Sequence, residues 1–377
     1  MGIHDLYKVL KDQCPNVIQE NIPLSTFTGY RIAVDISIFL NKNVKTAGPV
    51  DWITSFIQLL CCFKKCGIKP ICIFDGPNPP LEKKEEQGRR RGEADKKRRK
   101  ISELRRIQER LKKENEPNDI PPNPRVCEKI REMMKFSRKV SVDSINFDDI
   151  HDVITCLEIY ISTLERQNEP IVPMYAAMCK EIISIMGIAY FQASGEAEKL
   201  CAELCINGHV DGVLSEDTDV LAYGTHLFLC KINYSRETVS VIFHQDILAS
   251  LGFTHEQFLD MCILLACDYN KRAKMLAKSK KSKPVSVGCK KVYDLINDYG
   301  SIDGALDILV DVDNLKYERC RELFTPSKNI PLVVPYSKNI NEKKLAEFLK
   351  KHKVKLQYAS IIESWKPCKI LLQSVTA

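Results

Sequence analysis

Acidic residues at the ends of short buried strands constrain the fold of this 377-residue chain more than any other feature. Residues 31–35 and 68–75 are short β-branched runs that end in Asp35 and Asp75. Residues 50–66 between them are apolar and long enough for a helix, so the three segments predict a βαβ unit. Carboxylates at the C-terminal ends of parallel strands lie where open α/β sheets bind ligands.

A second strand-rich region starts near residue 187. Strands are predicted at 188–191, 210–214, 227–232 and 239–243, with a helix at 195–206 and helical pattern from about residue 245 onward. The expected fold class is therefore α/β, with a mostly parallel central sheet flanked by helices.

The middle of the chain is basic. Residues 82–113 hold fifteen Lys and Arg against seven Asp and Glu. Their apolar residues recur at helical spacing and form only a narrow stripe, which predicts a helix that is mostly exposed. Four prolines in residues 114–124 predict a linker, and helical periodicity returns at 125–139, 148–165 and 174–186.

The formal net charge of +7 is unevenly distributed. Residues 271–283 carry seven bases and no acid, residues 343–355 carry six bases and one acid, and the chain outside the basic stretches is acidic overall. This pattern suits a partner with a phosphate backbone that is processed at an acidic centre. The alternative is that the runs are solvated helix faces.

The sixteen cysteines form no C-x-x-C pair, and we interpret them as reduced thiols of an intracellular protein. No stretch approaches the ~18 apolar residues of a membrane span, so no membrane association is expected. Cys201, Cys205 and His209 follow a helical spacing, and we expect core packing there rather than a zinc site.

Seven acids follow predicted strands or begin predicted helices. They are Asp35, Asp75, Glu196, Glu198, Asp217, Asp219 and Asp268. Carboxylates are the ligands that Mg²⁺ and Mn²⁺ prefer, and two such ions can drive an in-line displacement at phosphorus. Taken singly, each acid could be a cap or a surface group, as Asp217 could cap the next turn.

Three segments resemble the successive signatures of the flap endonuclease/XPG family of structure-specific 5′ nucleases. They are residues 68–81, 187–198 and 214–224, and the amino-terminal block at 1–6 and 33–35 also fits the family. The resemblance implies a PIN-like 5′ nuclease fold with a helical arch. It also implies that the seven acids hold two Mg²⁺ ions, which Mn²⁺ could replace.

The implied activity is hydrolysis of branched or 5′-ended DNA (flaps, gaps, ends) during replication, repair or recombination, by a monomer. A relative acting on RNA, and a catalytically silent DNA-architectural subunit, are the alternatives. The acids argue against the silent subunit, because a pure DNA binder gains nothing by presenting carboxylates to phosphate.

Family members place a Lys and an Arg seven residues apart near the arch base, pointing at the scissile phosphate. Strict register puts Glu82 at the Lys position. Lys83 with Arg90, or Lys84 with Arg91, restores the spacing, and we favour the first pair as catalytic.

Residues 285–291 resemble the family's helix-two-turn-helix, which grips duplex DNA through backbone amides and often binds K⁺. Ser286 replaces the first glycine of the family pattern and Cys289 replaces its proline. These two replacements leave it undecided whether the chain has the K⁺ site. The DNA-binding residues expected from the resemblance are Gly2, Lys84, Arg91, Ser286, Gly288, Lys290 and Lys291.

The expected organisation has four regions. Residues 1–113 form the amino-terminal nuclease region with the start of the arch, 114–186 an arch extension, 187–300 the internal nuclease region, and 301–377 a C-terminal helical region. Residues 89–100 resemble a bipartite nuclear localisation signal, which favours the nucleus or a viral replication site. The tail at 371–377 shows no sliding-clamp box, as in the divergent copies of large DNA viruses.

Overall fold

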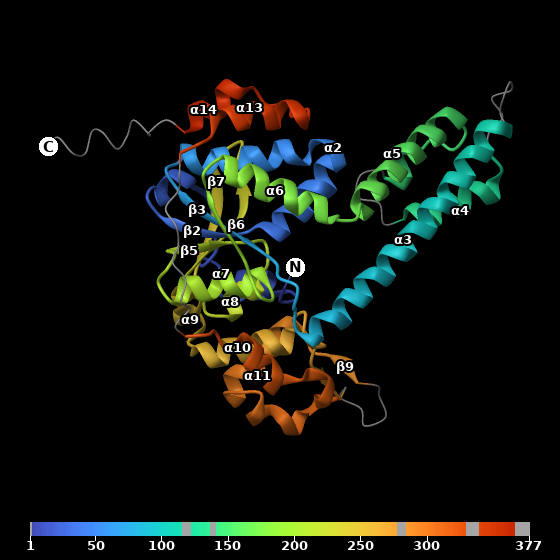
Figure 1. The fold of residues 1–377 in the computed structure, drawn as a ribbon. Helices are drawn as coiled ribbons and strands as arrows, with labels where there is room; N and C mark the ends of the chain where they lie inside the picture. The colour runs from blue at the N-terminus through green and yellow to red at the C-terminus, as the bar shows by residue number, and fades with distance from the viewer. Residues whose placement is uncertain (1, 115–121, 136–140, 277–283, 329–338, 366–377) are drawn as a thin grey trace. The chain divides into compact units, whose positions relative to one another are not determined.

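The computed structural model describes residues 2–114, 122–135, 141–276, 284–328 and 339–365. The chain divides into two compact units (Figure 1). The first unit comprises residues 1–41, 53–86 and 172–377, and the second comprises residues 42–52 and 87–171. The four-region organisation expected from the sequence stays a prediction.

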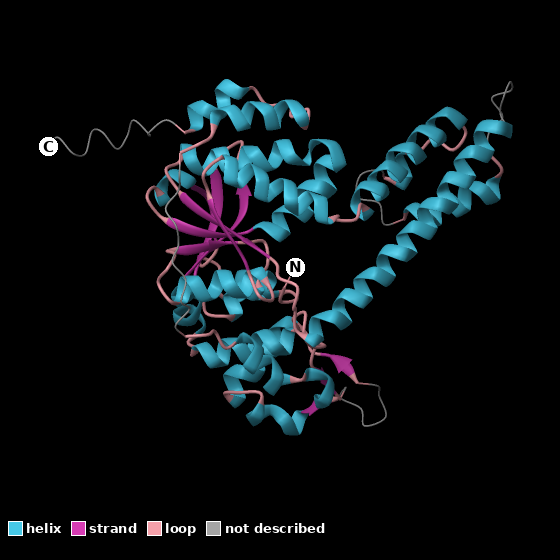
Figure 2. Cartoon of the chain, viewed as in Figure 1, coloured by secondary structure: helices cyan, strands magenta, loops and turns pink. Residues whose placement is uncertain are grey.

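A seven-stranded sheet forms the centre of the first unit (Figure 2). Its strands are β1 (Gln19–Pro23), β2 (Arg31–Asp35), β3 (Lys69–Phe74), β4 (Ala189–Gln192), β5 (Gly212–Leu214), β6 (Leu227–Asn233) and β7 (Thr238–Phe243). Their spatial order is β1-β7-β6-β5-β2-β3-β4, in which β6, β5, β2, β3 and β4 run parallel, β7 pairs antiparallel with β6, and β1 pairs antiparallel with β7. The predicted α/β class with a mostly parallel sheet is confirmed.

The register of the central strands aligns their carboxyl ends. Arg31 of β2 lies opposite Lys69 of β3, and Asp35 lies opposite Ile73. Residues 32–34 are buried on both faces of the sheet, which is why this strand is a continuous apolar run. Strand β1 was not predicted because it lies at the sheet edge and is mostly exposed, so it lacks an apolar alternation.

Helices cover both faces of the sheet, with α6 and α7 on opposite sides in Figure 1. The α-helices that lie wholly in the first unit are α1 (Leu6–Gln13), α6 (Pro173–Ile185), α7 (Ala197–Ile206), α8 (Asp219–Ala222), α9 (His244–Leu251), α10 (His255–Leu265), α11 (Cys289–Tyr299), α12 (Tyr317–Phe324), α13 (Glu342–Lys351) and α14 (Tyr358–Ser364). A second, small sheet consists of β8 (Lys274–Met275), β9 (Val285–Ser286) and β10 (Leu309–Val310). Strands β8 and β9 precede α11 in the sequence, and β10 follows it.

Helix α2 (Ile36–Lys65) begins earlier than the predicted helix at 50–66. The Asp35 side chain accepts a hydrogen bond from the amide of Ile38 and caps the helix. Gly48, with φ 84° and ψ 174°, interrupts the helical backbone immediately before Pro49. The element is therefore two helices joined at a kink, and only the second corresponds to the apolar run in the sequence.

The second unit is helical. It contains the greater part of α3 (Leu81–Glu114), with α4 (Pro124–Met134) and α5 (Ile150–Asn168). Its core includes Leu104, Ile130, Val153 and Leu157, all fully or almost fully buried. Most other α3 side chains are exposed, as the narrow apolar stripe predicts. A helical arch over the active site would depend on how this unit is placed relative to the first, so the arch stays a prediction.

The C-terminal basic run lies mostly on α13. Leu345, Phe348 and Leu349 are buried, and α13 packs against α6, whereas the lysines of residues 343–355 are exposed. A solvated helix face accounts for this run. The tail at 371–377 lies outside the described residues. Among the helices that the structure describes, none has the length and apolar content needed to cross a bilayer.

Candidate active site

Six of the seven predicted acids follow four neighbouring strands at one edge of the sheet. Asp35 ends β2, and Asp75 follows β3 directly. The pair Glu196 and Glu198 follows β4, and the pair Asp217 and Asp219 follows β5. Because β5, β2, β3 and β4 are parallel neighbours in that order, their carboxyl ends meet at a common edge. The topology therefore collects acids that are far apart in the sequence.

The seventh acid, Asp268, comes from the loop after α10. Thr254 and Gln257 form a capping box at the start of this helix. The helix ends at Ala266, which has φ 82° and ψ 137°, a conformation that an L-residue rarely adopts. The carbonyl of Ala266 accepts a hydrogen bond of 2.8 Å from the amide of His4. This irregular turn directs the chain to Asp268.

The ammonium group of Lys83 lies among three of the acids. Its Nζ is 2.7 Å from Glu196 Oε1, 2.7 Å from Asp268 Oδ2 and 3.2 Å from Glu198 Oε1. The Lys83 side chain is only 11% exposed, and its Nζ also lies 5.7 Å from the centre of the Tyr269 ring. Of the two candidate lysines, the structure therefore brings Lys83 into the acidic cluster.

Burial and mutual repulsion shape the electrostatics of this cluster. Burial, with the charges of Asp75 and Asp217, raises the pKa of Asp35 to about 7. Burial likewise raises the pKa of Glu198 and of Asp219 well above their ordinary values. Burial opposes the charge of Lys83, but the surrounding carboxylates, with Glu198 first, raise its pKa overall. The site thus carries an excess of negative charge, which Lys83 offsets in part.

Ser215 connects three of the acids, and the sequence analysis did not single it out. Its hydroxyl donates a hydrogen bond of 3.1 Å to Asp35 Oδ2 and accepts one of 3.0 Å from the amide of Asp217. The Asp217 carboxylate in turn accepts from the amide of Asp219 at 3.1 Å. The signal in the sequence was its place directly between strand β5 and the acidic pair.

Tyr269 is a second residue that sequence reasoning missed. Its hydroxyl donates to Glu196 Oε2 at 2.5 Å and lies 3.5 Å from the hydroxyl of Tyr223. A cavity of about 280 Å³ opens beside these two tyrosines and Glu196, and Lys199 also lines it. The position of Tyr269 immediately after Asp268 was the available signal.

The donor chemistry of the cluster fits hard divalent cations. Both carboxylate oxygens of Asp219 are buried, and neither has a hydrogen-bond partner in the described part of the chain. A buried carboxylate without such partners is costly unless a cation compensates it. Within the described ranges, no three Asp, Glu, His or Cys side chains already converge as an ion-binding group. In the described structure, the cation that lies among these carboxylates is the ammonium group of Lys83.

Gly2 packs directly against the acidic turn. Its φ is 81°, and a Cβ at this position would lie 2.0 Å from Asp217 Oδ1 and 2.7 Å from the amide nitrogen of Asp219. Only glycine fits such a close approach. Its predicted contact with DNA stays a prediction, but its backbone lies at the acidic turn.

The other residues predicted for the base of the arch are placed differently from Lys83. Lys84 is exposed in the first turn of α3, and Arg90 and Arg91 are exposed and belong to the second unit. Glu82, which strict register aligns with the family's lysine, pairs instead with Arg319 of α12 at 3.0 Å. The pairing of Lys83 with Arg90 stays a prediction.

The predicted duplex-gripping turn leads into α11. Gly288 is the N-cap of this helix, and Ser286, Gly288, Lys290 and Lys291 are all exposed. Arg272 fixes the turn by donating to the carbonyl of Val287 at 2.9 Å. An exposed helix N-terminus flanked by lysines suits a phosphate. The K⁺ site stays a prediction.

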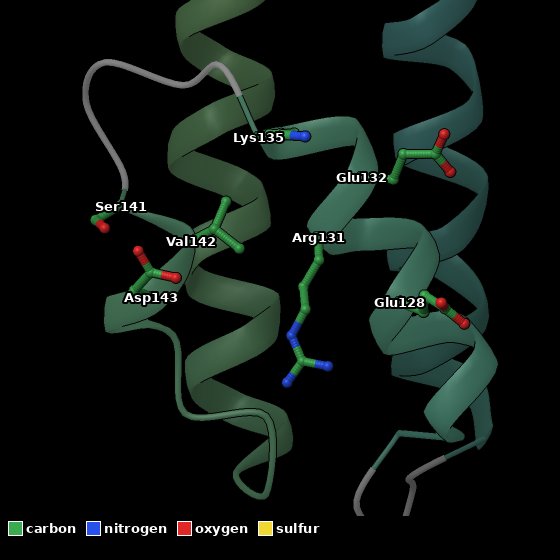
Figure 3. A pocket seen from close by; sticks show the side chains of 7 residues that line it. All are labelled: Glu128, Arg131, Glu132, Lys135, Ser141, Val142 and Asp143. Carbon is green, nitrogen blue, oxygen red and sulfur yellow. The ribbon is translucent and has the colours of Figure 1, made fainter.

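Two other features carry no active-site candidate. Cys201 and Cys205 of α7 are buried in the core, and the fifteen described cysteines are all free thiols. In the second unit, a pocket of about 730 Å³ is lined by charged residues that include Glu128, Arg131 and Asp143 (Figure 3). It contains none of the predicted site residues.

Comparisons with known proteins match this chain to a family of nucleases. Residues 1–97 match the XPG N-terminal domain, and residues 187–268 match the XPG I-region. The flap endonuclease 1 of Osmerus mordax is 31% identical over 325 residues, which cover 81% of this chain and 69% of that protein. The probable RAD2-like endonuclease 076L of Invertebrate iridescent virus 3 is 27% identical over 354 residues, or 88% and 87% of the two chains.

Solved structures share the fold. The catalytic core of Rad2 in complex with DNA substrate superimposes with a TM-score of 0.63 at 17% identity, covering 97% of this chain and all of that one. Flap endonuclease-1 from Methanococcus jannaschii gives a TM-score of 0.57 at 19% identity, covering 97% and 99%.

Proposed function

Because the chain belongs to the flap endonuclease/XPG family of nucleases, we propose that it hydrolyses phosphodiester bonds in branched or 5′-ended DNA with the help of two divalent cations. The observation that carries this proposal is the gathering of acids at one edge of the parallel sheet. The neighbouring parallel strands β5, β2, β3 and β4 deliver six of them to the place where such sheets bind their ligands.

The carboxylates are the residues that would hold the cations. The set is Asp35, Asp75, Glu196, Glu198, Asp217, Asp219 and Asp268. Divalent cations bound there would act as Lewis acids at the phosphate and activate the attacking water. Mg²⁺ and Mn²⁺ match this all-oxygen set.

The chain's own residues would orient the carboxylates. Ser215 links Asp35 to the backbone of Asp217, and Tyr269 holds one oxygen of Glu196. Such fixed partners keep the carboxylates of Asp35 and Glu196 in one orientation, as the groups that surround the ligands do in metal sites. Lys83 would bring a positive charge to the phosphate that enters the cluster.

DNA binding away from the acids would rest on basic and backbone groups. The exposed N-terminus of α11, with Lys290 and Lys291, would contact phosphates of the duplex. The exposed basic surface of α3 would contribute sequence-independent, salt-sensitive affinity. Relatives named flap endonuclease 1 favour a 5′ flap as the first substrate to test.

A cleavage panel tests the proposal. The full chain is incubated with 5′-labelled flap, gapped, nicked, blunt and bubble DNAs and with matched RNA, with and without Mg²⁺, and the products are mapped to the nucleotide. We expect Mg²⁺-dependent cleavage of branched DNA, leaving a 5′-phosphate. Faster cleavage of the RNA set would instead support the RNA-degrading alternative.

Two variants identify the acids as the cause. Asp217→Asn and Asp75→Asn should abolish cleavage while flap binding without divalent metal persists. Glu216→Gln is the matched control, because Glu216 lies in the same turn and belongs to none of the proposed ligands. Full cleavage by either Asp variant would refute the proposed role of the acids, and a wild-type chain that binds flaps without cutting them would favour the architectural alternative.

A further inference from the structure

Glu82 and Lys83 are consecutive residues with different partners. The Oε1 of Glu82 lies 3.0 Å from Nε of Arg319 on α12, and the Glu82 side chain is only 15% exposed. Lys83 instead contacts Glu196, Glu198 and Asp268. All these residues belong to the first unit. The first turn of α3 is therefore held between α12 and the acidic cluster.

A second, weaker contact joins the same two elements. Lys316 Nζ lies 3.4 Å from the carboxylate of Glu85, whose side chain is 74% exposed. This pair is open to water, and its attraction is screened accordingly. The pair of Glu82 and Arg319 is thus the better placed of the two to fix the direction of the turn.

Helix α12 is a firm support for this contact. Arg321 donates two hydrogen bonds, of 2.8 and 2.6 Å, to the buried carboxylate of Asp260 on α10. Cys320 and Phe324 of α12 are fully buried in the core. Helix α10 leads to Asp268, so the support for Arg319 is tied to the element that supplies one of the acids.

We propose that Arg319 is a positioning residue, which holds Glu82 and thereby directs the ammonium group of Lys83 into the acidic cluster. This inference rests on the proposed function, because it assigns Arg319 an effect on cleavage through Lys83. The two side chains leave adjacent positions of one helix turn, so releasing Glu82 allows the turn to rotate or fray and Lys83 to leave the acids.

The energetic expectation distinguishes positioning from stability. A partly exposed ion pair contributes little to the free energy of unfolding, since solvent screens it and ordering long side chains costs entropy. Small displacements of a group at a reacting centre reduce rates steeply. Loss of Arg319 should therefore reduce the cleavage rate far more than the melting temperature.

A double-mutant cycle on the full chain tests the coupling. Arg319→Gln and Glu82→Gln should each lower the single-turnover rate constant for flap cleavage on the order of tenfold, with the double variant no slower than either single variant. The KM and metal-free flap binding should stay within about twofold. Additive losses, or full activity of Arg319→Gln, would overturn the inference.

Hydrogen exchange supplies a readout without metal or substrate. Backbone amides of residues 82–86 should exchange faster in Arg319→Gln than in the unaltered chain. Glu322→Gln is the matched control, because Glu322 is the other partner of Arg319, at 2.8 Å, and lies on α12 itself. Equal exchange in Arg319→Gln and the unaltered chain would contradict a positioning role.

The Lys83→Gln background separates this inference from the proposed function. If Arg319 acts through Lys83, Arg319→Gln should cause no further loss of rate in that background. A further loss would show that Arg319 acts by another route and would overturn the inference while leaving the nuclease proposal intact. Full activity of Lys83→Gln would contradict the role proposed for Lys83 and, with it, this inference, whereas the acid variants test the nuclease proposal independently.

Discussion

The ammonium group of Lys83 lies 2.7 Å from the carboxylate of Asp268, although Lys83 lies in the first turn of α3 and Asp268 follows α10. The same ammonium group contacts Glu196 and Glu198. A cation in this position offsets charge that divalent ions would otherwise offset. Lys83 and a bound ion therefore act on the same carboxylates.

This relationship predicts how Lys83 affects ion binding. Lys83→Gln should bind Mg²⁺ on the order of tenfold more tightly than the unaltered chain, because the carboxylates lose a competing cation. Its cleavage rate should fall, because the phosphate loses a positive charge. Isothermal titration calorimetry without DNA measures the affinity.

Lys84→Gln is the control for that titration, since Lys84 is the exposed neighbour in the same helix turn. Its Mg²⁺ affinity should match that of the unaltered chain. Weaker Mg²⁺ binding by Lys83→Gln than by Lys84→Gln would show that Lys83 supports the ion rather than competing with it.

Stability should depend on pH through His244. Burial, then the nearby His255 and His226, lower the pKa of His244 to about 4, and its Nε2 lies 3.3 Å from Nδ1 of His255. In the unfolded chain its pKa returns to about 6.5, so between these values the unfolded state binds more protons. The contribution of His244 is present above pH 6.5 and is lost as the pH falls toward 4.

Between pH 7.5 and pH 5, this group alone should lower the free energy of unfolding by about 2 kcal/mol. Urea denaturation at the two pH values measures the difference, and His244→Gln should reduce it. An identical pH dependence in the variant would assign the effect to other groups.

The strand-end acids could be predicted from the sequence because their positions follow from short apolar runs and from parallel pairing. The choice between Lys83 and Lys84 could not be settled in this way. Both lie in the first turn of α3, and Lys83 contacts Glu196 and Asp268, which are distant in the sequence. Strand β1 escaped prediction because its residues are exposed at a sheet edge.

Gly76 should be irreplaceable for a steric reason that the sequence also did not reveal. A Cβ there would lie 2.0 Å from the carbonyl oxygen of Ala193, and the Gly76 amide donates to the carbonyl of Gly195 at 2.6 Å. Gly76→Ala should separate the loops that carry Asp75 and Glu196, lower the free energy of unfolding by about 2–3 kcal/mol and reduce cleavage strongly.

Thermal denaturation measures this loss of stability, and Gly92→Ala is the control, for which the opposite effect is expected. Gly92 lies within α3, and a Cβ added there would meet no atom within 4 Å, so alanine should stabilise the chain by about 0.5–1 kcal/mol. A Gly76→Ala chain as stable as the unaltered one would mean that the two loops can move apart at no cost.

Ala266 provides the last prediction, because its positive φ of 82° places strain next to Asp268. Glycine adopts this conformation without the Cβ penalty, and relief of the strain outweighs the greater entropy of glycine in the unfolded chain. Ala266→Gly should therefore raise the free energy of unfolding by about 1 kcal/mol, measured by urea denaturation. Ala266→Val should lower it, since a β-branched side chain tolerates positive φ least. The reverse order of the two variants would show that the turn at Ala266 is not strained in solution.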